Sequence, residues 1–93
     1  MSEIKNNYVY FIQCQDTGHV KIGHSNDVLR RLEQLQTGNS GRLVLIGFVP
    51  GGSAIEKSYH HAWQYSKVRG EWFDDSRLVE YIEKYCTGEL IGD

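Results

Sequence analysis

The sequence predicts one small α/β domain of the α+β type, with a mainly antiparallel sheet of three strands flanked by about three helices. Three observations predict this class: a hairpin pattern near the N-terminus, a later apolar run of strand length, and three segments with helical spacing of apolar residues. A chain of 93 residues has room for one compact domain with one modest core. We expect that core over about residues 7–86, followed by a short tail at 87–93.

The hairpin is the first expected element. Residues 7–14 read NYVYFIQC, a strand-like run of aromatic and branched side chains, and the turn signal QDTG at 15–18 precedes a second strand, HVKIG. A turn over 15–18 places three pairs opposite one another: Cys14 and His19, Ile12 and Lys21, and Tyr10 and Gly23. Tyr10 and Lys21 then share one face, and Gly23 is expected to leave open space over the Tyr10 ring, as a floor for a phosphate.

A helix is expected next. Ser25-Asn26-Asp27 offers side chains that cap helix N-termini, and Gly38 marks the stop. Arg31 falls at the edge of the apolar stripe, aimed toward the sheet, whereas Arg30 falls opposite it. The stripe itself consists of Val28, Leu29, Leu32 and Leu35.

The remaining elements are a strand and two helices. The nearly continuous apolar run at 43–49 fits a well-covered third strand, ended by Pro50-Gly51-Gly52. A second helix starts near Ser53, with Glu56 and His60 on one flank and with Lys57 and His61 pointing away. Its expected buried residues are Ile55, Tyr59, Ala62 and Trp63. A third helix follows Asp74-Asp75 and ends at Gly88; it is expected to pack through Leu78, Ile82 and Tyr85 or their neighbours.

Charge is distributed unevenly along the chain. The net charge of −2 argues by itself against a nucleic-acid partner. Residues 1–70, however, hold eight Lys and Arg against five Asp and Glu, a balance of +3, whereas 71–93 hold two against seven, a balance of −5. We expect the basic part to face a polyanion and the acidic part to face away, although random surface charge is the competing interpretation.

Other sequence features narrow the class of protein. No stretch is long and apolar enough to cross a bilayer, and the first residues lack a signal-peptide core, so we expect a soluble, cytoplasmic protein without a membrane partner. Cys14 and Cys86 lack the spacing of a zinc site or a disulfide framework. Both are expected to be ordinary packing thiols.

Five short motifs occur in a fixed order: VYFI at 9–12, VKIGHS at 20–25, RLEQLQTG at 31–38, EKSYH at 56–60 and GEWF at 70–73. Together they resemble the GIY-YIG nuclease superfamily over most of the chain. The similarity is greatest to a small branch, common in phage and bacterial proteins, that carries VKIGxS, RLxxLQTG, ExxxH and GEWF. The resemblance implies a GIY-YIG-like fold and a metal-dependent endonuclease that hydrolyses phosphodiester bonds of nucleic acid, with DNA as the expected substrate.

The resemblance also implies catalytic roles. Glu56 matches the glutamate that holds the single divalent metal, Mg²⁺ or Mn²⁺, although it could also be a solvated glutamate paired with His60. Tyr10 matches the tyrosine that deprotonates or orients the attacking water, for which its pKa of about 10 would be lowered by a cation. Lys21, where many members have a second tyrosine, is expected to supply that cation. The competing interpretation is an ordinary strand tyrosine and an exposed lysine.

Arg31 matches the arginine that holds the scissile phosphate together with Lys21 and Gly23. A salt bridge at the helix edge, to Glu33 or Asp27, is the alternative. Leu35 stands where many members have a polar residue, and His24 could replace it by hydrogen bonding Tyr10 or the water, unless it is a surface histidine.

Two further motifs complete the expected site. His60 is part of the branch pattern and is expected to support Glu56 or the phosphate. In GEWF, Trp72 and Phe73 are expected to be core or lid residues, and Glu71 either a supporting ligand or a salt-bridge partner. The asparagine that many members carry late in the fold has no match.

Other function classes stay open. The leading alternative is a catalytically inactive module of the GIY-YIG fold that binds nucleic acid or has a regulatory role. Another is a protein-interaction domain whose acidic segment after Gly70 binds a basic partner. Since the chain has no appended DNA-reading domain, it would cut with little preference, recognise branched or flapped DNA, or depend on a targeting partner or a homodimer. RNA is a competing substrate.

Overall fold

The computed structural model describes residues 7–86, so the expected helix end at Gly88 and the expected tail at 87–93 lie outside the described residues. The strands are β1 (Tyr8–Cys14), β2 (Val20–Ser25), β3 (Leu43–Pro50), β4 (Lys67–Arg69) and β5 (Trp72–Phe73). The helices are α1 (Val28–Thr37), α2 (Ser53–Ala62) and α3 (Ser76–Tyr85), with a short 3₁₀ turn at Gln64–Ser66.

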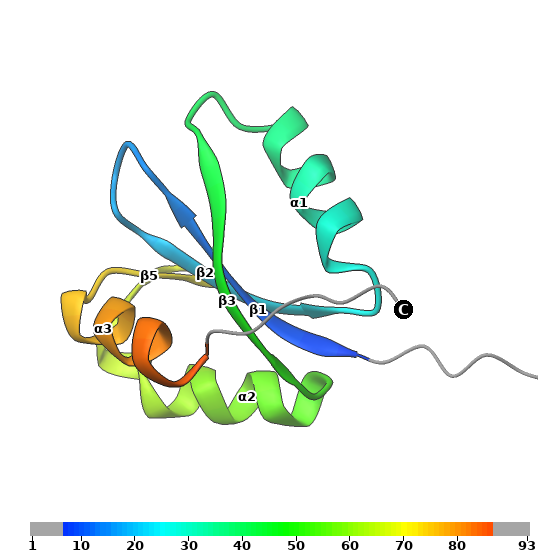
Figure 1. Cartoon of the computed structure of the whole chain (residues 1–93). Coiled ribbons are helices and arrows are strands. Elements are labelled where there is room, and N and C mark those ends of the chain that lie inside the picture. Colours follow the sequence, from blue (N-terminus) through cyan, green and yellow to red (C-terminus); the bar gives the residue numbers. More distant parts are fainter. Residues whose placement is uncertain (1–6, 87–93) are drawn as a thin grey trace, which may run out of the picture.

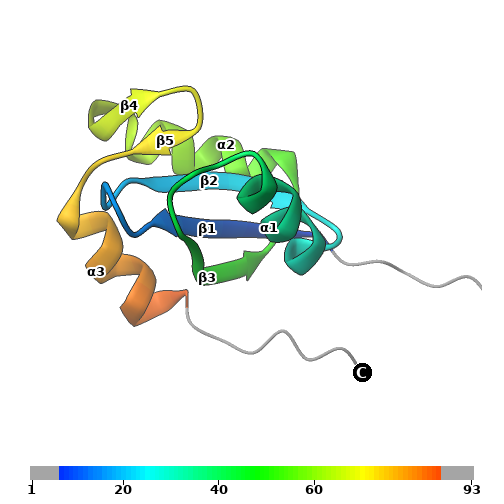
Figure 2. The same ribbon diagram turned by 90° about the horizontal axis from the view of Figure 1, so that it is seen from above.

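The five strands form one antiparallel sheet in the order β3-β1-β2-β5-β4. Helix α1 lies on one face, and α2 and α3 lie on the other (Figure 1). Viewed from the α1 side, α1 covers only one end of the sheet, and the β4–β5 hairpin lies beyond it (Figure 2). The predicted α+β class is confirmed. The predicted strand number was too low, because β4 and β5 are three and two residues long and too short to show alternation.

The register of the first hairpin is the predicted one. Tyr10 pairs with Gly23 and Ile12 with Lys21, and the Cys14 amide donates to the His19 carbonyl over 2.9 Å. The space over Gly23 is nevertheless not open. The Tyr10 ring fills it, since a Cβ at position 23 would lie 2.6 Å from the ring Cζ.

Two apolar clusters sandwich the sheet, one on each face. The α2/α3 side is built around Phe11, Ile22, Phe73, Leu78 and Ile82. The α1 side is built around Tyr10, Ile12, Cys14, Val28 and Leu43, with Leu32, Leu35 and Trp72 packed against them. Alternate residues of β1 therefore enter different clusters, as the pleat of a strand requires.

Strand β3 lies at one edge of the sheet, and its side chains pack against the apolar clusters on both faces. A bulge between the Phe11–Gly47 and Ile12–Leu45 pairs leaves Ile46 as the extra residue. After the bulge, each β3 side chain faces the opposite side of the sheet from the one that regular alternation would give it. Consequently Leu45 packs on the α1 side whereas Val49, which would share its face in a regular strand, packs on the α2/α3 side.

The helices follow the predicted spans but not every predicted burial. Asp27 caps α1 by accepting from the Arg30 amide over 3.2 Å, and Gly38 ends it. Four residues expected in the core are exposed instead, since each lies beyond the edge of its helix's contact with the sheet: Leu29, Ile55, Ala62 and Tyr85. Cys86, next to Tyr85, is buried in its place.

Both cysteines are free and buried, as expected of packing thiols. Over residues 7–86, none of the helices has the length and apolar character needed to cross a membrane.

Candidate active site

The exposed edge of β2 is where the candidate residues gather. Strand β5 pairs with β2 only at Val20 and Lys21, and the next amide, that of Ile22, donates to the Glu71 carbonyl over 2.9 Å. Beyond this point α2 takes the place of a neighbouring strand. The Ile22 carbonyl receives a hydrogen bond from His60 Nε2 at 2.8 Å, so a side chain of α2 satisfies the strand edge.

Glu56 lies at the centre of this edge, one turn before His60 on α2. Its Oε1 is 2.6 Å from His24 Nδ1, and its Oε2 is 3.3 Å from His60 Nε2. The Glu56 side chain is largely buried, with 13% of it exposed. A carboxylate accepts and does not donate, so His24 donates from Nδ1 to an ionised Glu56. His60 lies within ion-pair distance of Glu56, but its hydrogen bond goes to the Ile22 carbonyl.

The tautomer of His60 follows from its second partner. Since the Ile22 carbonyl can only accept, Nε2 of His60 carries the proton. In this arrangement His60 orients Glu56 and keeps its lone pair on Nδ1, while the ring packs edge-on against Phe73 with centroids 5.0 Å apart. This position fits the predicted support of Glu56.

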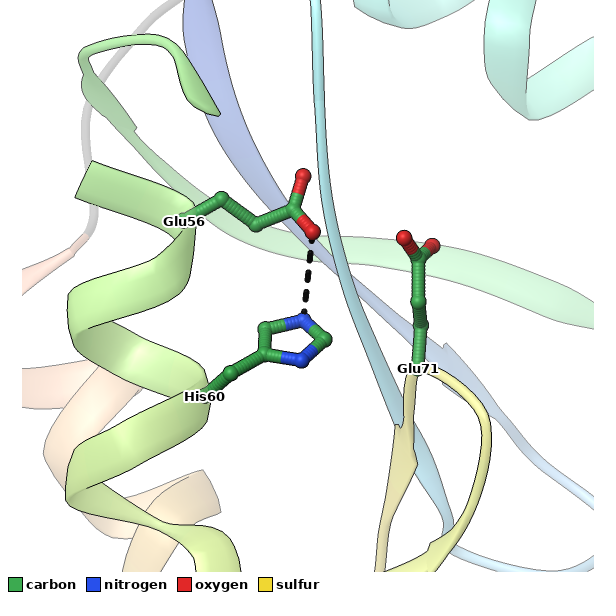
Figure 3. A group of neighbouring side chains, drawn as sticks. All are labelled: Glu56, His60 and Glu71. Atoms are coloured by element: carbon green, nitrogen blue, oxygen red, sulfur yellow. Dashed lines mark ion pairs between the residues drawn. The ribbon is translucent and has the colours of Figure 1, made fainter. Parts of the chain in front are cut away.

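Glu71 joins the site from the turn between β4 and β5. Glu56, His60 and Glu71 each place a ligand atom within 4.8 Å of the others, and Figure 3 shows Glu71 facing the two α2 side chains across β2. Glu71 also binds Lys21, with 3.1 Å between Oε1 and Nζ. Both predicted interpretations of Glu71 are therefore geometrically compatible, and this one residue of the acidic segment lies at the candidate site.

Tyr10 is 1% exposed and lies beneath the charged groups. Burial raises its pKa above the ordinary value of 10.0, and the negative charges of Glu71 and Glu56 act in the same direction. Arg31 opposes them through its charge and a hydrogen bond. The predicted lowering by Lys21 was wrong: the cation that acts on Tyr10 is Arg31, and burial outweighs it.

Arg31 thus reaches the sheet from α1, as its place on the helix predicted. The ion pairs among residues 7–86 include none from Arg31 to Glu33 or Asp27, so the competing salt bridge is not formed. A hollow of about 180 Å³ opens beside it, lined by Ser25, Asn26, Asp27, Arg30, Arg31 and Gln34. Arg30, which is exposed, also lines this hollow.

The family of the chain is decided by its match to a domain model. The model of the T5orf172 domain matches residues 7–87, which includes every element of the sheet and all three helices. The chain belongs to the T5orf172 domain family. No curated protein and no solved structure matches it.

The T5orf172 fold brings together all the residues that the sequence singled out. Gly23 lies against the Tyr10 ring, and the charges of Arg31, Glu56 and Glu71 act on the Tyr10 hydroxyl. Lys21, His24 and His60 pair with the two carboxylates. His24 differs from the expectation in its partner, which is Glu56 rather than Tyr10. Glu71 also lies in this cluster, and its signal in the sequence was its position in GEWF.

Proposed function

We propose that this T5orf172 chain is a metal-dependent endonuclease that hydrolyses phosphodiester bonds of nucleic acid, with DNA as its substrate. The observation that carries the proposal is the meeting of Glu56 and Glu71 within 4.8 Å next to Tyr10 and Arg31. Carboxylates beside a phosphate-binding arginine are the groups that metal-assisted phosphodiester hydrolysis needs. The order of motifs shared with GIY-YIG nucleases supports the same chemistry.

The donors at this edge suit one Mg²⁺ or Mn²⁺ ion, which prefers oxygen ligands and retains several waters. Glu56 and Glu71 would hold it, and His60 would fix the orientation of Glu56 through its Nε2 proton. Such an ion supplies Lewis-acid stabilisation of the phosphate and acidifies bound water.

Tyr10 and His24 are the groups available to handle the attacking water. With its pKa raised, the Tyr10 phenol keeps its proton near neutral pH and acts as a hydrogen-bonding group that orients water. His24 donates to Glu56 from Nδ1, so a neutral His24 ring presents Nε2 as an acceptor. Of Tyr10 and His24, only His24 can therefore accept a proton from the attacking water in this arrangement.

Arg31 and Lys21 are the cations available for the phosphate. Arg31, which lines the hollow at the start of α1, offers a planar fork suited to two phosphate oxygens. Lys21 adds a point charge from β2, held 3.1 Å from Glu71. The products expected from the GIY-YIG resemblance are a free 3′-hydroxyl and a 5′-phosphate.

Replacement of Glu56 tests the proposal. Glu56→Gln keeps the size of the side chain but removes its charge, so cleavage of supercoiled plasmid in Mg²⁺ or Mn²⁺ should fall by a factor of about 100 or more. Glu83→Gln, on the exposed face of α3, is the matched control and should cut normally. Undiminished cleavage by purified Glu56→Gln would sink the assignment.

One observation favours a second candidate, a nucleic-acid-binding module without catalysis. Each acidic group of the site already has a protein partner: Glu56 has two histidines and Glu71 has Lys21. The charges are thus compensated without a metal. A salt-dependent gel shift with no cleavage in any divalent metal would select this candidate.

We also propose where the protein acts and how it is directed to its substrate. We place the protein inside the cell, where its DNA is available, and we expect targeting to come from a partner or from a second copy of the chain. Size-exclusion chromatography with and without DNA distinguishes these two modes of targeting.

A further inference from the structure

A second groove, separate from the hollow at α1, lies beside the candidate active site. It has a volume of about 410 Å³ and is lined by Cys14, Thr17, His19, Asn39, Val68, Arg69 and Trp72. This volume is in the range of ligand-binding pockets. Its lining includes a cation, Arg69, and no carboxylate. Two carboxylates lie near its margin: Asp74, 3.7 Å from His19, and Asp16, whose charge acts on Cys14.

Trp72 connects this groove to the candidate active site. It pairs in register with Lys21, whose Nζ lies 5.6 Å from the centroid of the indole ring and binds Glu71. The indole also packs against the apolar cluster on the α1 side. Trp72 is therefore an anchored aromatic surface with one end at the charged site and a part that lines the groove.

We propose that the groove holds one unpaired base of a single-stranded DNA segment, stacked on Trp72 next to the bond that is cut. The inference rests on the proposed function and specifies its substrate: DNA that is unpaired at the cleavage point, such as a single strand or a flap. Stacking on an aromatic side chain with a cation beside the backbone is how single strands are commonly bound. A base within a duplex is paired and cannot enter such a groove without being extruded.

The spacing of the two sites agrees with a continuous strand of DNA. His19 in the groove and Lys21 at the active site are two residues apart along the hairpin strand, a separation of about 7 Å. A separation this short can be spanned by neighbouring nucleotides of one strand. Arg69 and the half-exposed Val68, 51% accessible, would contact the backbone and the base from the β4 side.

Binding without cleavage tests the inference. Glu56→Gln protein in EDTA is titrated into fluorescein-labelled oligo(dT), and anisotropy reports the affinity. Adding Trp72→Ala should weaken binding by about 10-fold, and Trp72→Phe should restore most of it. Tyr65→Ala, at an aromatic side chain that is 95% exposed and outside the groove, is the matched control and should have no effect.

Two further comparisons make the result decisive. Abasic oligonucleotides should bind equally to the parent and to Trp72→Ala, and a blunt duplex should bind more weakly than the single strand. If Trp72→Ala does not fold, Arg69→Ala and Val68→Asp, at exposed positions of β4, should weaken oligo(dT) binding in its place.

The outcomes separate this inference from the proposed function. Equal affinity of the parent and the groove variants, or equal binding of duplex and single strand, would overturn the base site and leave Glu56-dependent cleavage intact. Cleavage that is independent of Glu56 would remove the proposed function, whatever the anisotropy shows.

Discussion

Tyr10 occupies the space that a side chain at position 23 would fill, and this single contact holds the site together. The ring lies over Gly23, is almost fully buried, and is close enough to Arg31, Glu56 and Glu71 for their charges to act on its hydroxyl. Glycine is required at 23 because of this close approach and not because of its backbone conformation, since Gly23 does not have a positive φ.

Gly23→Ala is therefore expected to displace the Tyr10 ring. Overpacking at a rigid strand pair should lower the free energy of unfolding by about 1–3 kcal/mol and reduce cleavage. Urea denaturation measures the first effect. Gly38→Ala is the control, because its Cβ would meet nothing closer than 4.0 Å and its stability should match wild type within about 0.5 kcal/mol. Equal stability of the two variants would contradict the proposed contact.

Glu71 allows a second test at the residue scale. If it helps to hold the metal, Glu71→Gln should raise the Mn²⁺ concentration needed for half-maximal cleavage by about 10-fold. A residue that only pairs with Lys21 would change stability and leave the metal dependence unaltered. Glu80→Gln, exposed on α3, is the matched control for the loss of one charge.

At the scale of the elements, the candidate site lies where β5 stops pairing with β2 and α2 packs along the strand edge instead. Two local features position the surrounding elements: the bulge in β3 and the N-terminal cap of α3. The bulge in β3 lets one edge strand serve both apolar clusters, and the cap of α3 fixes where the chain leaves β5. Asp75 makes that cap: it accepts from the Arg77 amide at 2.9 Å and from Ser66 Oγ at 2.6 Å.

Asp75→Asn tests the charge of this cap. Hydrogen bonds from Arg77 and Ser66 hold the pKa of Asp75 well below its ordinary 3.8, so its stabilising effect is present above that pH and is lost as pH falls below it. Since asparagine still caps helices, the variant should lose a few degrees of Tm at pH 7, and its difference from wild type should shrink steadily as pH falls below 3.8. Asp74→Asn, whose carboxylate is more exposed, should change Tm less.

At the scale of the whole molecule, the sheet separates two cores, one with the buried Tyr10 and the other with the partly buried Tyr59. Tyr10 lies on the α1 side. On the other side Tyr59 packs edge-on against Phe11, with centroids 5.1 Å apart. Burial, and then a hydrogen bond with Tyr81, raises the pKa of Tyr59 above 10.0.

High pH should therefore destabilise the fold through ionisation of a tyrosine in each core. A phenol whose folded pKa exceeds its unfolded value of about 10 contributes stability that is complete below pH 10 and is lost as pH rises above it. The free energy of unfolding should fall from pH 8 to pH 11 in wild type, and less steeply in Tyr10→Phe and Tyr59→Phe. Tyr65→Phe, at an exposed position, should follow wild type; identical slopes for all four proteins would refute the idea.

The sequence by itself determined the local structure of this protein. Capping residues, the helical spacing of apolar positions and the turn at 15–18 act over a few residues, so they predicted the three helices, the hairpin register and the opposition of Tyr10 and Gly23. The motif order also identified Glu56, Arg31, His24 and His60 as candidates. Their catalytic roles remain predictions.

Only the tertiary structure decided which groups meet. Whether Glu71 turns toward Glu56, whether His24 binds Glu56 or Tyr10, and whether burial or Arg31 controls the Tyr10 pKa depend on separations and burial that no local pattern encodes. The same holds for β4 and β5, since strands of two or three residues are stabilised by their neighbours and not by their own sequence. Long-range packing thus set the electrostatics of the site, while local sequence set the elements that carry it.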